Sequence, residues 1–312
     1  MDEFLRSLPK AELHVHLEGS LEPSTLQEID PRLSDEEIGR HYRYRDFAGF
    51  LEGFKWVTGY LRGPDEYALA TRRLLERLGE QGVQYAEIIV AAGTVLFHKQ
   101  KFAPIYDAIG REAARSKVEV WWIFDAIRHF GVDHAMEVAK LAVERAGNGV
   151  VAFGIGGDEA RGPAEWFTET FRFVRQHGLH AHAHAGETMG AASVWAALEA
   201  GAERIGHGIG SVHDARLLAH LRERDIALEI CPSSNVATGA VASLAAHPLR
   251  RIFDAGVPVV LNTDDPAMFH TTLLAEYELA AREFGFTRTE LEQLAANSFR
   301  YAFRRPGAVP SK

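Results

Sequence analysis

Two kinds of segment alternate along the chain. Short apolar runs, typical of buried strands, are separated by longer stretches in which apolar residues recur every three to four positions, as in amphipathic helices. This pattern predicts eight strands, at residues 11–17, 83–91, 118–125, 150–156, 180–184, 204–207, 226–230 and 257–262. It predicts helices between most of them, including 65–81, 104–115, 132–146 and 164–177.

Eight repeats of strand and helix favour an α/β fold of one type, the parallel (β/α)8 or TIM barrel with its helices outside. A doubly wound two-domain sheet is the competing architecture. However, no GxGxxG motif opens a helix after the first strand, and no Pro/Ser-rich linker divides the 312 residues. We therefore expect one domain over residues 1–312.

Two segments are longer than a minimal barrel needs. Residues 22–60, after the first strand, carry an aromatic stripe of Phe47, Phe50, Phe54 and Trp56. Such a stripe suits packing against the barrel, and its place after a strand end also suits an inserted lid. Residues 271–303 are expected to form extra C-terminal helices, with Thr287 starting a capping box at the last one.

Composition narrows the classes of partner. A formal charge of −9 disfavours nucleic acid, since phosphate binding depends on Lys and Arg. The single cysteine, Cys231, excludes an intramolecular disulfide, fits a reducing compartment and is expected to be inert. The N-terminus does not resemble a signal peptide, and no apolar run reaches the ~20 residues of a membrane helix. We expect a cytoplasmic protein with no membrane partner, and leave its oligomeric state open.

Ionisable residues gather at the ends of the predicted strands. In a parallel barrel the carboxyl ends of the strands form the active-site face. His14 and His16 are two residues apart, so their side chains point to the same side of the first strand. The other residues at or just after strand ends are His184, Glu187, His207, Asp264 and Asp265. We expect all of these side chains to meet.

Three imidazoles and a carboxylate, from His14, His16, His184 and Asp264, form a nitrogen and oxygen set suited to zinc, with a position left for water. Zinc lowers the pKa of a bound water from 15.7 to about 7, which makes hydroxide available at neutral pH. The set therefore indicates hydrolytic chemistry. Glu187, three residues past His184, is close enough to give a proton to the substrate.

Other ionisable residues have alternative interpretations. His207 suits either a fifth ligand or, as we favour, a base that holds the water. His180 and His182 are expected to be packed or hydrogen-bonded core histidines. Asp158 and Glu159 suit a helix N-cap and a first-turn acid at least as well as catalysis. Arg128 is expected to pair with a carboxylate more readily than to bind a substrate anion.

Five ordered motifs, HVHLEG, HAGE, RIGHG, CPSSN and LNTDDP, resemble those of the adenosine deaminase family of metal-dependent amidohydrolases. The resemblance extends from about residue 10 to residue 303. It implies one zinc ion per chain, held by His14, His16, His184 and Asp264. It also implies that Glu187 protonates N1 of a purine while hydroxide attacks C6.

The same resemblance assigns the remaining contacts. It implies that His207 orients and deprotonates the water, that Asp265 hydrogen-bonds N7, and that the backbone of Gly157 meets N3. The implied products are a 6-oxopurine compound and ammonia.

One position departs from the usual adenosine deaminase pattern. Glu18 stands in HVHLEG where those enzymes usually have an aspartate that contacts ribose. HLEG together with CPSSN is more similar to the branches acting on adenine or on 6-amino-6-deoxyfutalosine, a menaquinone-pathway nucleoside. SNVATGAV and FKWVTGYL resemble the latter branch in particular. Glu18 is therefore expected to contact substrate.

These features predict a zinc-dependent deaminase of a 6-aminopurine nucleoside, with aminodeoxyfutalosine favoured and adenosine next. One alternative is an adenine deaminase. Another is an amidohydrolase with a non-purine substrate, against which the lack of a carboxylated-lysine pattern for a second metal counts. A third is a barrel without activity that serves only in binding, although every position of the proposed set is intact.

Overall fold

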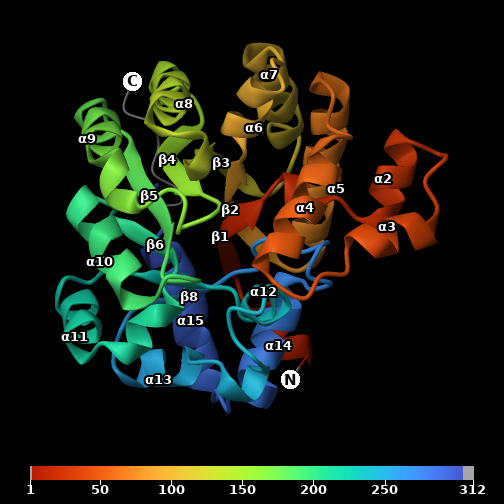
Figure 1. Cartoon of the computed structure of the whole chain (residues 1–312). Coiled ribbons are helices and arrows are strands. Elements are labelled where there is room, and N and C mark those ends of the chain that lie inside the picture. The colour runs from red at the N-terminus through yellow and green to blue at the C-terminus, as the bar shows by residue number, and fades with distance from the viewer. Residues whose placement is uncertain (1, 305–312) are drawn as a thin grey trace.

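The strands form one parallel sheet with the order β1-β2-β3-β4-β5-β6-β7-β8 in a computed structural model that describes residues 2–304. Their bounds are β1 Lys10–His16, β2 Val83–Val90, β3 Glu119–Ile127, β4 Val150–Gly156, β5 His180–Ala185, β6 Arg204–His207, β7 Leu228–Ile230 and β8 Val259–Leu261. Each coincides with one predicted strand, and helices surround them (Figure 1). The (β/α)8 barrel prediction is confirmed.

The barrel closes where β8 meets β1. A parallel bridge pairs Val15 with Asp264. The amide of His16 donates to the carbonyl of Asp264 at 2.7 Å, and the amide of Asp264 donates to the carbonyl of His14 at 3.0 Å. Since parallel strands all run the same way, this closure brings the end of the first strand beside the segment after the last one.

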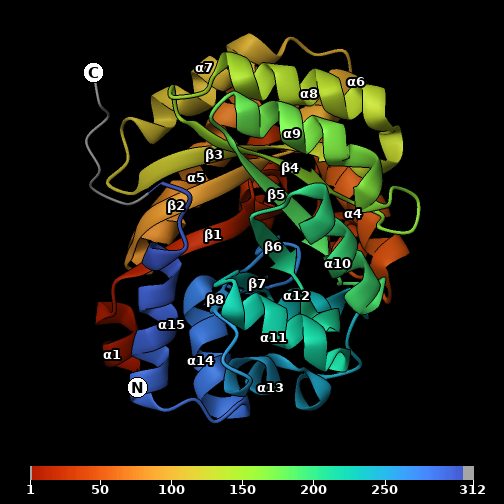
Figure 2. The ribbon, with the colours of Figure 1, turned by 90° about the vertical axis from the view of Figure 1, so that its left-hand side faces the viewer.

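The helices cover the outside of the barrel, as the view from the side shows (Figure 2). Those of the first half are α1 Asp2–Ser7, α2 Pro23–Ile29, α3 Asp35–His41, α4 Phe47–Thr58, α5 Pro64–Glu80, α6 Ala92–Phe97, α7 Phe102–Ala113 and α8 Val132–Glu144. Those of the second half are α9 Thr168–Gln176, α10 Gly190–Ala200, α11 Ala215–Glu223, α12 Pro232–Ala237, α13 Leu249–Asp254, α14 Leu273–Glu283 and α15 Arg288–Arg300.

Amphipathic spacing explains how these helices pack. In α5 the buried residues include Tyr67, Leu74 and Leu78, which recur at helical spacing and face the barrel. The predicted helix at 164–177 is a 3₁₀ turn, Ala164–Phe167, followed by α9. At the start of α15 the Thr287 side chain and Glu290 form the expected capping box. None of the helices within residues 2–304 is long and apolar enough to span a lipid bilayer.

The excursion after β1 folds into α2, α3 and α4. In α4, Phe47, Phe50 and Phe54 line a pocket at the carboxyl ends of the strands, so this helix both packs on the barrel and covers its mouth. Trp56 behaves differently: its ring stacks on His41 of α3, with centroids 4.1 Å apart. The aromatic stripe is therefore divided between the pocket and the packing of α4 against α3.

Candidate active site

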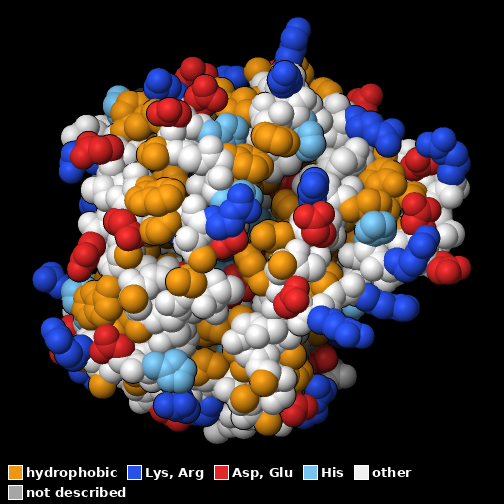
Figure 3. Space-filling view, viewed as in Figure 1, with side chains coloured by type: hydrophobic (Ala, Val, Ile, Leu, Met, Phe, Trp, Pro, Cys, Tyr) orange, Lys and Arg blue, Asp and Glu red, His pale blue; other side chains and the backbone are white. Residues whose placement is uncertain are grey.

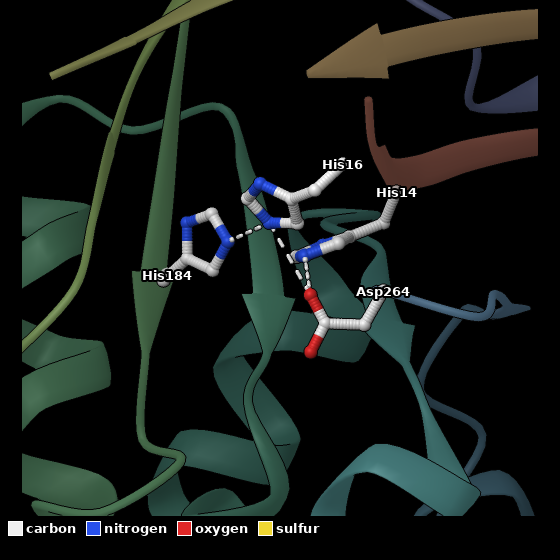
Figure 4. A group of neighbouring side chains, drawn as sticks. All are labelled: His14, His16, His184 and Asp264. Carbon is white, nitrogen blue, oxygen red and sulfur yellow. Dashed lines mark hydrogen bonds and ion pairs between the residues drawn. The ribbon is translucent and has the colours of Figure 1, made fainter. Parts of the chain in front are cut away.

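Four side chains from three parts of the chain converge at the carboxyl ends of the strands. They are His14 and His16 of β1, His184 of β5, and Asp264 after β8 (Figure 4). Their ligand atoms all lie within 4.8 Å of one another. The Nε2 atoms of His16 and His184 are 3.1 Å apart, and Oδ1 of Asp264 is 3.2 Å from Nε2 of both His14 and His16. The structure thus brings together the set expected from the sequence.

Hydrogen bonds behind two of the histidines fix which nitrogen faces the centre. Nδ1 of His184 lies 3.0 Å from the carbonyl of Ile155, and Nδ1 of His14 lies 2.8 Å from the Glu229 carboxylate. Because a carbonyl or carboxylate oxygen accepts, each Nδ1 carries a hydrogen and a neutral ring keeps its lone pair on Nε2. This is the arrangement that metal-ligating histidines have.

The electrostatics of the cluster also suit a cation. Burial, with the neighbouring histidines, lowers the pKa of His184 well below its usual value, so its ring is neutral. Burial opposes a charge on His14, but Asp264 and Glu229 outweigh it and raise its pKa to about 10. The lone pair of neutral His184, the Asp264 carboxylate and the acceptors around His14 therefore converge where positive charge is favoured, and the donor set fits a divalent metal ion.

Asp264 is held in an uncommon backbone conformation. Its φ is +66°, a left-handed value that non-glycine residues rarely adopt. The Ser234 hydroxyl donates to its Oδ2 at 2.7 Å, which leaves Oδ1 turned toward the histidines. His207 has a similar φ of +61°. Such strain persists only where surrounding structure imposes it, and it is common at functional sites.

Glu187 and His207 lie beside the cluster and face each other. The Nε2 atom of His207 is 3.6 Å from Oε2 of Glu187 and 3.9 Å from Oδ2 of Asp264. Burial, together with the charges of Asp264 and Glu159, raises the pKa of Glu187 well above its usual value. The raised pKa extends the protonated form, the state that a general acid needs, to a higher pH than for a free glutamate.

The pocket above the cluster has a volume of about 400 Å³. It includes His16, His184, Glu187, His207, Asp264, Asp265 and Gly157 in its walls. In the space-filling view, hydrophobic side chains together with histidines and charged side chains surround the hollow of this face (Figure 3). Burial and the Asp264 charge raise the pKa of Asp265 well above its usual value, which favours its protonated form.

Glu18 is placed differently from the other expected contacts. Its side chain is fully buried and accepts a hydrogen bond from the Ala91 amide at 3.0 Å, and it is not among the residues that line the pocket. The adjacent Gly19 is needed for a steric reason: a Cβ there would lie 1.7 Å from Oδ1 of Asp265. Glu18 and Gly19 therefore support the pocket wall from behind.

Two further expectations, for Asp158 and Glu159, are wrong because no helix begins there. Asp158 instead accepts from the amides of Ala160 and Arg161 in a turn. Glu159 is buried and accepts from the amides of Gly186, Glu187 and Thr188 at 2.8–3.0 Å, and from the Ser193 hydroxyl. Glu159 therefore holds the loop that carries Glu187.

The remaining sequence expectations have mixed outcomes. His182 is a buried, hydrogen-bonded core histidine, as expected, whereas His180 is half-exposed and pairs with Glu203. Arg128 is buried, but it donates to the carbonyls of Gly162 and His184 and not to a carboxylate. Cys231 is a buried free thiol, and burial raises its pKa well above the usual value, which is consistent with an inert group.

Two buried carboxylates near the cluster were not singled out from the sequence. Glu229 of β7 contacts His14, His182 and Arg204, and Arg204 also pairs with Glu87 at 2.6 Å. Asp125 of β3 lines the pocket, and burial raises its pKa to about 8. Both carboxylates stand on strands, so position at a strand end was the one available clue.

Comparisons with known proteins agree with this geometry. The family model described as adenosine deaminase matches residues 9–306. An aminodeoxyfutalosine deaminase of Streptomyces coelicolor is 38% identical, covering 96% of this chain and 81% of that protein. An adenine deaminase of Rhizobium leguminosarum bv. trifolii is 36% identical and covers 95% of both chains.

A solved structure extends the comparison to three dimensions. A crystal structure of an amidohydrolase from Burkholderia ambifaria, with bound Zn, superposes with a TM-score of 0.88 at 26% identity, covering 97% of this chain and 88% of that one. The family match spans nearly the whole chain and includes all of the converging side chains. This chain therefore belongs to the adenosine deaminase family of enzymes.

Proposed function

We propose that this chain is a zinc-dependent, single-domain deaminase that converts a 6-aminopurine nucleoside into the 6-oxo compound and ammonia. The observation that carries the proposal is the position of Glu187, a buried carboxyl group with a raised pKa beside three histidines and an aspartate that suit one zinc ion. Similarity to deaminases over most of the chain supports the reaction type.

The metal ligands in this proposal are His14, His16, His184 and Asp264. Zinc held by them would lower the pKa of a water molecule to about 7 and so supply hydroxide at neutral pH. Glu229, Ile155 and Ser234 are the groups that keep three of these ligands oriented.

The protein side chains then perform the proton transfers and hold the purine. Glu187 donates its proton to N1, which makes C6 more electrophilic for addition of water. His207 lies against Glu187 and orients that water. Of the two protons of the water, one ends on the departing amino group, which leaves C6 as ammonia, and the other returns to Glu187, so the 6-oxo ring keeps its hydrogen on N1.

Two groups orient the purine ring. Protonated Asp265 donates to N7, which can only accept. The backbone amide of Gly157 meets N3. Gly157 has a φ of +89°, and a Cβ there would approach the ring of His129 to 3.2 Å, so a side chain at this position is strained.

The substrate favoured is 6-amino-6-deoxyfutalosine, with adenosine next. The pocket extends from the cluster to a rim lined by Phe97, Phe130 and His129, beyond the space that a free base needs beside Glu187. The aminodeoxyfutalosine deaminase relative also supports this choice. The adenine deaminase relative, almost as similar, supports adenine as the second candidate. Glu18 influences the choice through its support of the wall at Ala91.

A substrate panel tests the proposal. Zinc-loaded protein is incubated with adenine, adenosine and aminodeoxyfutalosine, and the loss of absorbance at the aminopurine band is followed. We expect kcat/KM to be higher for the nucleosides than for adenine, and highest for aminodeoxyfutalosine. Adenine as the sole substrate would reject the nucleoside assignment, and metal analysis giving two ions per chain would favour an amidohydrolase of another class.

A further inference from the structure

A chain of hydrogen bonds runs from a backbone amide to the imidazole of His207. The amide of Leu249 donates to Nδ1 of His247 at 3.1 Å, and Nε2 of His247 lies 3.1 Å from Oδ1 of Asn235. Nδ2 of Asn235 lies 3.0 Å from Nδ1 of His207. All four residues are buried, so water does not compete for these bonds.

The direction of every bond follows from the first one. A backbone amide can only donate, so Nδ1 of His247 is an acceptor and the neutral ring carries its hydrogen on Nε2. That hydrogen requires an oxygen on the facing side of Asn235. The opposite amide orientation would place two donors 3.1 Å apart.

The remaining group of Asn235, its NH₂, then faces His207. It donates to Nδ1 of His207, so that nitrogen carries the lone pair and the neutral ring has its hydrogen on Nε2. Burial lowers the pKa of His247 to about 4, which keeps the middle ring of the chain neutral and supports this polarity.

We propose that Asn235 and His247 are positioning residues that fix His207 as a hydrogen-bond donor toward the attacking water. Nε2–H of His207 points into the space beside Glu187 and Asp264, at 3.6 and 3.9 Å from their nearest oxygens. The family resemblance implies that His207 both orients and deprotonates the water. With the chain intact, the nitrogen that faces the water has no lone pair, which leaves the orienting task.

Nitrogen NMR of the zinc-loaded protein labelled with ¹⁵N-histidine tests the tautomer directly. His207 is assigned by its absence from a His207→Gln sample. The expected spectrum has the hydrogen of His207 on Nε2 and a lone pair on Nδ1. A hydrogen on Nδ1 overturns the proposal. This readout needs no substrate, so it stands apart from the proposed deaminase function, on which only the role toward the water rests.

Asn235→Asp reverses the last hydrogen bond of the chain, the one to His207, with little change in shape. A carboxylate only accepts, so the hydrogen of His207 is expected to move to Nδ1 and Nε2 to become the lone-pair nitrogen. We expect kcat to fall by about 10- to 100-fold, as for other outer partners that orient a histidine, with KM nearly unchanged. A reversed tautomer with undiminished kcat would show that donation from Nε2 is not used.

Two substitutions at His247 separate the hydrogen bond from packing. His247→Leu removes the donor to Asn235 and is expected to mix the two tautomers and lower kcat by about 10-fold. His247→Gln keeps an N–H donor and should retain the wild-type spectrum and most of kcat. Thr170→Val removes a buried hydroxyl in α9, away from His207, and is the control for the loss of a buried polar group. If His247→Leu and His247→Gln changed the spectrum and kcat equally, the positioning role would be contradicted.

Discussion

The floor and the rim of the pocket are built by different kinds of segment. The floor consists of strand ends, and its side chains are buried and held from behind by hydrogen bonds, as for His14, His184 and Asp264. The rim consists of helices and loops whose side chains make mainly ring contacts, such as Phe97, which is 60% exposed and stacks on Phe130 at 4.7 Å.

The difference indicates that the floor and the rim have separate roles. Bonds that fix a side chain within a few tenths of an ångström suit proton transfer and metal binding, which depend on orientation. Ring contacts on exposed segments tolerate change and suit the choice among related substrates. Substitutions in the floor should therefore abolish turnover, whereas substitutions in the rim should alter the ranking of substrates.

The largest effect is expected for His184→Ala. Without this ligand zinc should be lost, and without zinc the pKa of water stays near 15.7, so turnover should fall below detection. Metal analysis measures the zinc content, and the deaminase assay measures turnover. His180→Ala is the matched control, because His180 stands in the same strand but is half-exposed and pairs with Glu203. Full zinc content in His184→Ala would contradict the ligand assignment.

Glu187→Gln should keep zinc and lose most turnover. The amide cannot donate an acidic proton to N1, and general acid catalysis contributes about 10²- to 10⁴-fold. kcat and zinc content are measured in the same preparation. Glu165→Gln, at an exposed acid, is the control and should match wild type. Unchanged kcat in Glu187→Gln would mean that another group is the acid.

The pH profile of the wild type tests the same acid. Since the folded pKa of Glu187 is raised, the protonated form persists above the usual glutamate pKa and is lost as the pH rises through the raised value. kcat/KM should therefore fall about tenfold per pH unit above that pKa. A rate that instead rises across neutral and alkaline pH is inconsistent with an acid role.

Glu159→Gln should have a smaller effect than Glu187→Gln. The carboxylate accepts three amides of the loop after β5, and an amide group would direct donors at some of them. Hydrogen bonds to a charged group contribute about 1.5–3 kcal/mol each, so losing one should lower kcat by roughly 10- to 160-fold. Zinc content should be retained. Kinetics identical to wild type would show that the loop keeps its conformation without the Glu159 carboxylate.

The smallest effect is expected at the rim, for Phe97→Ala. Aromatic contacts contribute about 0.5–1.5 kcal/mol, equal to a roughly 2- to 13-fold loss of kcat/KM for a nucleoside and little change for adenine. The substrate panel measures the ratio. Trp166→Ala, another exposed aromatic that does not line the pocket, is the control. An equal loss of kcat/KM for adenine would show that Phe97 does not determine the substrate preference.

The sequence by itself determined the barrel and most of its chemistry. Strands and helices follow from local periodicity, and each of the eight predicted strands is present. The converging set, from His14 to Asp264, was expected because parallel strands deliver their carboxyl ends to one face. Both inferences depend on the short-range periodicity of apolar residues and on the rule that parallel strands end at the same face of a barrel.

Only the tertiary structure decided which groups stand behind that set. Glu229 reaches His14 across 215 positions, and Glu159 reaches the Glu187 loop from the preceding strand's end. Glu18 was expected at the substrate but lies behind the pocket wall. Hydrogen-bond partners are set by three-dimensional distance and by the balance of donors and acceptors in a buried space. Neither quantity has a period along the chain, so neither could be read from the sequence.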